Sequence, residues 1–410
     1  MHAGADDVSC LGRGCTKSHT TFMDCNSLSE GPFSNQESVR LTFVHKAWRY
    51  RWWVLLAVLS GLAYGPVVRL WRAKALLTIL ATPSERSTRI EVTEDQEQLV
   101  GTDGPIRARL YRPTSGNLHR GIVVAHGIHY QGIEERRLVA FARALARSGF
   151  TVLTPELVDL ADYRLTRASV DRIAIAVDSL ASRRDYVEGG RVGLLGFSFA
   201  GGLSLLAASE PRLAHRLDYV VSVGGHHDLE RVFHFLLTNE MATPRGMVSA
   251  KAHDYGLAVV LYANLEEFLP NAEVPPAREA FRAWLHEDPT AARSKARCLK
   301  GEGARLFRLL ETQKLTQLSN ELEAVVNKHR SELDDLSPRG HLKQIGVPVL
   351  FLHGSHDSVI PPSEAEFAVI ELSGSPHDVL VTPLMEHVEV SKAAGLREKF
   401  RLMNFMSQLF

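Results

Sequence analysis

Cysteine is scarce in this 410-residue sequence, and neither sign of charge is in excess. Cys10, Cys15 and Cys25 lie in a polar N-terminal stretch and Cys298 lies in the body, a distribution that argues against a disulfide framework. Lysine plus arginine number 47, as do aspartate plus glutamate, and the basic clusters are not interleaved with aromatic residues. This balance does not favour a nucleic-acid partner. A phosphate-cradling glycine loop is also missing from the sequence, and we expect no cofactor.

Large apolar side chains are rare in residues 1–39, which are rich in serine, glycine, asparagine and threonine. We therefore expect residues 1–45 to form a disordered tail, with Met23 as an alternative start. The run Trp52–Val68 that follows is uncharged. As a helix it spans roughly 25 Å, slightly less than the ~30 Å hydrocarbon core of a bilayer. Tryptophans flank it, as in aromatic belts, at Trp48, Trp52, Trp53 and Trp71.

These features predict a single-pass membrane anchor over residues 46–75. A signal-peptide core, or an apolar helix docked on the folded domain, is the alternative. Arginines close both ends of the run in similar numbers, so the positive-inside rule does not choose the side of the membrane on which the rest of the chain lies.

A serine stands where an apolar strand passes into an apolar helix. The run Arg191–Leu195 leads into Gly-Phe-Ser-Phe-Ala-Gly-Gly at 196–202, and small and apolar residues follow at 203–208. This order predicts a strand, a sharp turn at Ser198 and a helix, with the hydroxyl exposed at the helix N-terminus. The fifth position of the Gly-x-Ser-x-Gly pattern is Ala200, so the pattern is incomplete. The alternative is a turn whose serine only caps the helix.

A serine nucleophile needs a histidine to accept its proton and a carboxylate to orient that histidine, here in the chain order Ser, Asp or Glu, His. Asp357 follows the apolar strand pattern Val347–Leu352, and His387 follows the short strand pattern Asp378–Val381. Taken alone, each has a simpler interpretation, as a turn residue or a surface histidine. Together they predict the triad Ser198, Asp357 and His387.

Asp228 is the alternative carboxylate, because it too follows a strand pattern, Tyr219–Val223. We favour Asp357 because of its placement shortly before the histidine loop.

The oxyanion hole of such a site uses the N–H after the nucleophile and an N–H from an earlier strand-to-helix loop. We assign these donors to Phe199 and to Ile128, which follows the strand pattern Gly121–Ala125. Gly127 lets the backbone approach the substrate, and His126 precedes it in the same loop. A metal site at His126 and His129, or at His226-His227-Asp228, is the alternative; such loop spacings rarely hold a metal, and we expect none.

Strand and helix patterns alternate up to Val223, which predicts a doubly wound, mostly parallel α/β sheet. Ile106–Tyr111, which leads to Pro113, is expected to be an edge strand. From residue 229 to 337 the alternation stops, and short apolar clusters of helical character are broken by prolines. We expect a core formed by residues 85–228 and 338–410, with 229–337 as a helical cap that roofs an apolar acyl pocket. An accessory helical bundle is the alternative for this insertion.

On His126-Gly127, Gly196–Gly202, the segment 348–361 with Asp357, and His387, the chain resembles the α/β-hydrolases. It is most similar to the dienelactone-hydrolase-like and prolyl-oligopeptidase-like serine hydrolases, over roughly residues 90–410. The resemblance implies an eight-stranded, mostly parallel sheet and acyl-enzyme chemistry on an ester, thioester or amide. Ala200 and the long insertion depart from the pattern. Dienelactone hydrolases use a cysteine nucleophile, and no cysteine lies near Ser198, so that activity does not carry over.

We therefore expect a membrane-anchored serine hydrolase that cleaves a carboxylic ester or related acyl bond in a small-molecule or lipid-like acyl substrate. A serine peptidase or an acyltransferase with the same triad is the alternative within enzymes. An inactive hydrolase fold, used as a membrane-tethered binding module, is the alternative from another class.

Overall fold

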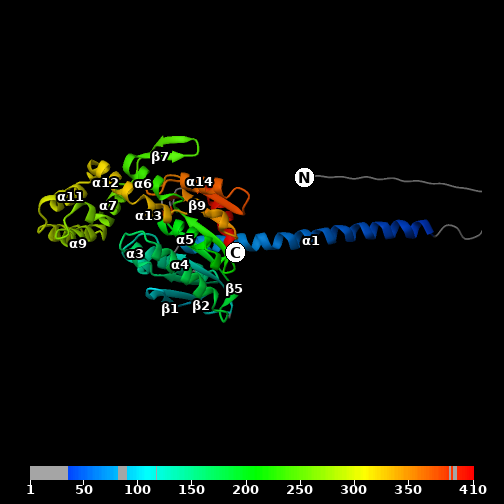
Figure 1. Ribbon diagram of the computed structural model, residues 1–410. Coiled ribbons are helices and arrows are strands. Elements are labelled where there is room, and N and C mark those ends of the chain that lie inside the picture. Colours follow the sequence, from blue (N-terminus) through cyan, green and yellow to red (C-terminus); the bar gives the residue numbers. More distant parts are fainter. Residues whose placement is uncertain (1–35, 82–89, 117, 387–388, 391–394) are drawn as a thin grey trace, which may run out of the picture. The chain divides into compact units, whose positions relative to one another are not determined.

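The computed structural model describes residues 36–81, 90–116, 118–386, 389–390 and 395–410 (Figure 1). The chain divides into a first compact unit that ends at Ala63 and a second unit, Tyr64–Phe410.

Helix α1 (Gln36–Ala81) carries the apolar run that the sequence analysis assigned to a membrane anchor. The helix begins inside the stretch that we expected to be a tail, and it contains Pro66. The segment Trp53–Leu80 has a mean hydropathy of 1.6 and is the one described helix that is long and apolar enough to cross a membrane. Large apolar side chains such as Leu59 and Leu62 are exposed along it.

The last turns of α1 are partly buried, because they belong to the core of the second unit. Ala73, Leu76 and Ile79 recur at intervals of three residues and are buried. They share one apolar cluster with Leu402 and Phe405 of α15 (Leu396–Met406). The apolar helix therefore continues beyond the expected anchor as part of the folded body.

The second unit is built on an eight-stranded sheet with the order β1-β2-β4-β3-β5-β6-β9-β10. The strands are β1 (Val92–Gly101), β2 (Gly104–Pro113), β3 (His119–Ala125), β4 (Phe150–Pro155), β5 (Val187–Phe197), β6 (Leu217–Val223), β9 (Val349–Gly354) and β10 (His377–Thr382). From β4 to β10 all neighbours are parallel, whereas β1 and β2 are antiparallel additions at one edge. The doubly wound, mostly parallel sheet predicted from the sequence is therefore present.

The expectation of an edge strand at Ile106–Tyr111 is wrong, because β2 pairs with both β1 and β4. The edge is β1, whose sequence Val-Thr-Glu-Asp-Gln-Glu-Gln-Leu-Val-Gly is largely exposed. Such a polar strand carries little hydrophobic alternation, so its sequence gives no strand signal.

Helices cover both faces of the sheet. In β3, Ile122 and Val124 face one apolar cluster, and Val123 and Ala125 face the other, as alternation along a strand requires. The first face packs against α2 (Arg136–Arg147), α15 and the end of α1. The second packs against α4 (Arg167–Ala181), α5 (Phe199–Ser209) and α14 (Ser363–Glu371). The short helix α3 (Val158–Ala161) follows β4.

The expected cap, residues 229–337, is a mostly helical insertion between β6 and β9, and its role as a roof over an acyl pocket stays a prediction. Its helices are α6 (Leu229–Thr238), α7 (Asp254–Ala263), α8 (Leu265–Phe268), α9 (Val274–Leu285), α10 (Pro289–Ala296), α11 (Gly301–Glu311), α12 (Ser319–Lys328) and α13 (Arg330–Asp335). A hairpin of β7 (Glu240–Thr243) and β8 (Gly246–Ser249), which the helical pattern did not predict, follows α6. Figure 1 shows α7, α9, α11 and α12 grouped together at one end of the second unit. A second small pair, β11 (Met385–Glu386) and β12 (Glu389–Val390), follows β10.

Candidate active site

Ser198 lies in the strained turn that the sequence predicts. Its backbone has φ 54° and ψ −134°, a region that residues other than glycine rarely adopt. The turn joins the end of β5 to the first residue of α5, and the Ser198 N–H donates to the carbonyl oxygen of Val223 in β6 at 2.8 Å. The Ser198 side chain makes no capping hydrogen bond to the helix, so the alternative role as a simple cap is not observed.

Glycines surround this turn because other residues do not fit. A Cβ atom on Gly196 would overlap the carbonyl oxygen of Ala200, and one on Gly202 would overlap the imidazole of His226. The methyl group of Ala200 itself is fully buried. The missing fifth glycine of the pattern is therefore accommodated, while the first glycine is required.

The loop after β3 lies directly against the serine. A Cβ atom on Gly127 would stand 3.1 Å from the Cβ of Ser198, so glycine allows this close approach. Ile128 follows and is half-buried. The N–H of Phe199, as the first residue of α5, lies beyond the reach of an intrahelical acceptor. The loop backbone and the helix start thus meet at Ser198, where the oxyanion donors are expected.

His126 stabilises this loop through hydrogen bonds of its imidazole ring to backbone groups. Its Nε2 accepts the N–H of Leu157 at 2.9 Å, so the proton is on Nδ1, which donates to the carbonyl oxygen of Gly127 at 2.8 Å. Burial lowers the pKa of His126 to about 4, although the bond to Gly127 opposes this shift. The imidazole is therefore neutral, and it holds the loop through two hydrogen bonds.

Asp357 lies buried at the carboxyl end of β9, two strands from β5. Its Oδ1 accepts the N–H groups of Val359 and Ile360 at 2.9 and 3.0 Å, and its Oδ2 is 3.4 Å from Nε2 of His353. The turn considered as the simpler interpretation is thus present, made by one carboxylate oxygen. The cap approaches the same loop, because the His253 N–H donates to the carbonyl oxygen of Ser358 at 2.8 Å.

His387, the expected base, lies outside the described residues. The residue before it, Glu386, ends β11, which lies against β9. The N–H of Ser355 in the Asp357 loop also donates to the carbonyl oxygen of Thr382, at the end of β10, at 3.0 Å. The chain that leads to His387 is therefore joined to the loop that carries Asp357.

Both carboxylate oxygens of Asp228, the alternative acid, make structural contacts. Its Oδ1 caps α6 by accepting the N–H of Glu230 at 2.9 Å, and its Oδ2 is 3.0 Å from both Arg231 Nη1 and Arg339 Nη1. These partners favour Asp357 as the acid of the site.

The histidines considered as metal ligands are bonded to protein groups instead. His226 Nε2 donates to the carbonyl oxygen of Leu336 at 3.0 Å. Arg231 donates to His227 Nδ1 at 3.0 Å, which leaves the Nε2 proton of His227 to bind Glu371 at 2.7 Å. Within the described ranges, no group of three or more His, Cys, Asp or Glu residues is placed to hold a metal ion.

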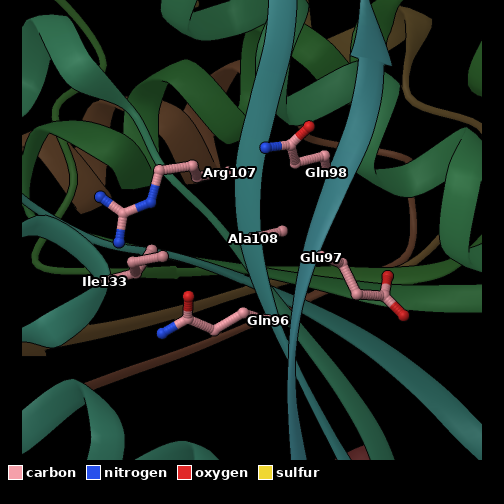
Figure 2. Close-up of a pocket in the computed structure, with 6 residues that line it drawn as sticks. All are labelled: Gln96, Glu97, Gln98, Arg107, Ala108 and Ile133. Carbon is pink, nitrogen blue, oxygen red and sulfur yellow. The ribbon is translucent and has the colours of Figure 1, made fainter.

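Two cavities lie near the first strands of the sheet, and Ser198 lines neither. The first, of about 380 Å³, lies over β1 and β2 (Figure 2). Figure 2 shows Gln96 and Arg107 on one side of the strands and Glu97 on the other, so its polar groups do not converge. The second, of about 450 Å³, is bounded by core residues that include Tyr130 and by His286 of the cap.

The cap meets the core through a set of aromatic and charged side chains that the sequence analysis did not identify. Tyr130 stacks on His286 with ring centroids 4.3 Å apart, and the Tyr163 hydroxyl donates to the carbonyl oxygen of Leu285 at 2.8 Å. Tyr262 donates to Asp162 Oδ1 at 2.8 Å. These pairs are distant in sequence, so no local pattern indicates them.

No family model and no curated protein sequence matches this chain. Among solved structures it is similar to an acylaminoacyl peptidase in complex with Z-Gly-Gly-Phe-chloromethyl ketone, with 13% identity over 77% of this chain and 40% of that one and a TM-score of 0.44. It is also similar to an esterase of Pyrobaculum calidifontis, with 17% identity over 87% and 97% and a TM-score of 0.43. A dienelactone hydrolase from Anabaena variabilis ATCC 29413 aligns with 14% identity over 76% and 95% and a TM-score of 0.40.

The chain thus spans two fifths of the length of the peptidase and nearly all of the esterase and the dienelactone hydrolase. These likenesses are distant, and the fold is assigned from the chain itself. The strand order β1-β2-β4-β3-β5-β6-β9-β10 and the strained serine between β5 and α5 are the features that decide it. The chain has the fold of the α/β-hydrolase superfamily.

Proposed function

We propose that this protein is a membrane-anchored serine hydrolase that cleaves a carboxylic ester or related acyl bond. The observation that carries the proposal is the backbone of Ser198, a residue other than glycine held at φ 54° between β5 and α5. A strained turn is retained where its surroundings enforce it, and it is the conformation that presents a nucleophilic serine at the edge of this fold.

In the proposed reaction, Ser198 Oγ attacks the acyl carbon while His387 accepts the hydroxyl proton. The carbonyl oxygen becomes an oxyanion between the N–H groups of Phe199 and Ile128. The alcohol leaves with the proton returned by His387, and an acyl-serine ester remains. Water, deprotonated by His387, then attacks this ester, releases the acid and restores Ser198. Asp357 orients the imidazole and stabilises its charged form.

Three contacts support the assignment of roles. Gly127 brings the loop of Ile128 against Ser198, and His126 fixes the carbonyl of Gly127 by a hydrogen bond. Asp357 is buried at the end of β9, where parallel sheets gather their functional groups. The His253 N–H of the cap donates to the carbonyl oxygen of Ser358 in the Asp357 loop, which supports a role for the cap in access to the site.

Membrane anchoring is supported by the exposed large apolar side chains of α1 between Trp53 and Trp71. It is tested by the variant with Leu59→Arg and Leu62→Arg, two exposed positions near the middle of the uncharged run. Each arginine at the centre of a spanning helix costs about 3 kcal/mol, so the double variant should move from the carbonate-resistant membrane fraction to the soluble fraction. If the wild-type protein and the double variant resisted carbonate extraction equally, the proposed membrane anchor would be contradicted.

The catalytic assignment is tested with a fluorophosphonate probe, which forms a stable bond with an activated serine. The wild-type chain should be labelled, and Ser198→Ala should abolish labelling. Ser204→Ala is a matched control, because Ser204 is a buried serine on the same helix α5. Labelling that survives in Ser198→Ala, or a wild-type chain that is not labelled, would refute the proposed enzyme.

A further inference from the structure

The segment that directly follows β4 contacts both ends of the loop that carries Ile128, the oxyanion loop (residues 126–133). At the start of this loop, His126 Nε2 accepts the N–H of Leu157 at 2.9 Å. At its end, the N–H of Ile133 donates to the carboxyl group of Glu156. Two consecutive residues after β4 therefore bind the oxyanion loop at its start and at its end.

Glu156 is well placed to fix the end of the loop, because its own backbone is fixed to the sheet. The Glu156 N–H donates to the carbonyl oxygen of Arg107 in β2 at 2.8 Å. The side chain is buried, and a Cβ atom on Gly132, which has φ 49°, would overlap Oε1 of Glu156. Glycine allows both this positive φ and the close approach of the carboxyl group to the loop backbone.

Glu156 can bind the loop without carrying a charge. Burial raises its pKa above the usual range, against the opposing effects of Arg107 and of the Ile133 N–H. Its Oε1 is 3.8 Å from Nε2 of His126, whose imidazole is neutral. A neutral carboxyl group still has a carbonyl oxygen that accepts an N–H. Ile133 is buried, and a buried N–H that loses its acceptor destabilises the backbone that carries it.

Backbone hydrogen bonds join the end of the loop to the proposed oxyanion donor. The N–H of Gly132 donates to the carbonyl oxygen of His129 at 2.9 Å, and the N–H of Glu134 donates to that of Gln131 at 2.8 Å. His129 directly follows Ile128, so a displacement of Gly132 reaches the backbone of Ile128 through one intervening residue. An oxyanion donor acts only where it is held close to the developing charge, so such a displacement slows the reaction.

We propose that Glu156 is a positioning residue of the oxyanion loop: its carboxyl group accepts the Ile133 N–H and thereby fixes the N–H of Ile128 for the oxyanion. The proposal rests on the proposed hydrolase function and adds to it a residue that does not touch the substrate. The role requires a hydrogen-bond acceptor at the end of the side chain rather than a negative charge.

The test compares Glu156→Leu, which removes the acceptor, with Glu156→Gln, which keeps it. The substrates are 4-nitrophenyl butyrate and its thiono analogue, in which sulfur replaces the carbonyl oxygen. Sulfur accepts hydrogen bonds weakly, so the thionoester gains little from the oxyanion donors. In the full-length protein, Glu156→Leu should lower kcat/KM for the oxygen ester by about tenfold and change that for the thionoester by less than about twofold. Glu156→Gln should retain both values.

Two further variants serve as controls. Glu134→Gln changes a half-exposed carboxylate that directly follows Ile133 and pairs with arginines, and it should leave both kcat/KM values unchanged. Glu156→Asp withdraws the carboxyl group by one methylene; it should lower the oxygen-ester value selectively and serves in place of Glu156→Leu if that variant does not fold. Equal losses on both esters would show that Glu156 only stabilises the fold, and would overturn the proposal.

Hydrogen exchange of backbone amides separates this proposal from the proposed enzyme, because it requires no turnover. Glu156→Leu should speed exchange in residues 128–133 by about tenfold, whereas Glu156→Gln and Glu134→Gln should not. Faster exchange in Glu156→Leu, with a wild-type chain that fluorophosphonate does not label, would refute the hydrolase and keep the role of Glu156 in fixing the loop. Unchanged exchange in Glu156→Leu would overturn that role, whatever the activity.

Discussion

The carboxylate of Glu364 accepts a hydrogen bond from the backbone N–H of Asp228, with 2.7 Å between Oε2 and the nitrogen. The same oxygen accepts the N–H of His227 at 2.9 Å, and Arg231 Nε donates to Oε1 at 2.8 Å. Glu364 lies at the start of α14, just after the Asp357 loop, whereas Asp228 precedes the first cap helix. The buried carboxylate of Glu364 therefore links the helix that follows the Asp357 loop to the segment after β6 and to the first cap helix, α6.

Glu364→Ala should strongly destabilise the fold. The substitution leaves Arg231 without one of its carboxylate partners and two buried N–H groups without an acceptor, and breaking such a buried pair costs about 3–5 kcal/mol. Denaturant unfolding measures the loss. Glu366→Gln, at an exposed residue of the same helix, should change the unfolding free energy by less than about 0.5 kcal/mol. A Glu364→Ala protein as stable as that control would show that the network contributes nothing.

Asp357→Asn and Asp228→Asn should separate catalysis from stability. Replacing the triad carboxylate by an amide impairs the orientation and charge of the imidazole, so we expect kcat of Asp357→Asn to fall by about four orders of magnitude. Asp228→Asn instead weakens two arginine contacts and should lower the unfolding temperature while the folded protein keeps its activity. Ester hydrolysis and thermal unfolding of both variants provide the measurements. The reverse pattern would make Asp228 the catalytic acid.

Two substitutions in the turn at Ser198 are expected to have opposite effects on activity. Gly196→Ala should abolish folding or activity, because the new methyl group meets the backbone carbonyl of Ala200, which cannot move without breaking α5. Ala200→Gly completes the Gly-x-Ser-x-Gly pattern and should keep the activity, at a cost of about 1 kcal/mol for glycine in a helix. Soluble expression and fluorophosphonate labelling report on both. Full labelling of Gly196→Ala would show that the turn is less constrained than described.

The parts of this fold that the sequence predicts are those with local signals. The apolar strands β3, β5, β6 and β9, the turn at Ser198 and the position of Asp357 follow from short hydrophobic runs and from small residues next to them. The polar strand β1 has no such signal, so the sequence predicts β2 as the edge of the sheet, although β1 lies outside it.

The contacts of Glu364 were not predicted because they depend on tertiary structure. Glu364 binds residues that lie more than 130 positions earlier in the chain.

His226 should make stability depend on pH. Burial lowers its pKa from the usual 6.5 to about 4, against the opposing effect of its bond to Leu336, so the folded protein keeps this imidazole neutral. Between pH 6.5 and 4 the unfolded chain takes up a proton that the folded protein does not. Stability is therefore fully present above pH 6.5, and it falls as the pH drops toward 4, by about 3 kcal/mol for this group. His226→Gln, whose amide retains a donor for Leu336, should flatten the fall of unfolding free energy measured over this range. Identical slopes in wild type and variant would contradict a neutral, buried His226.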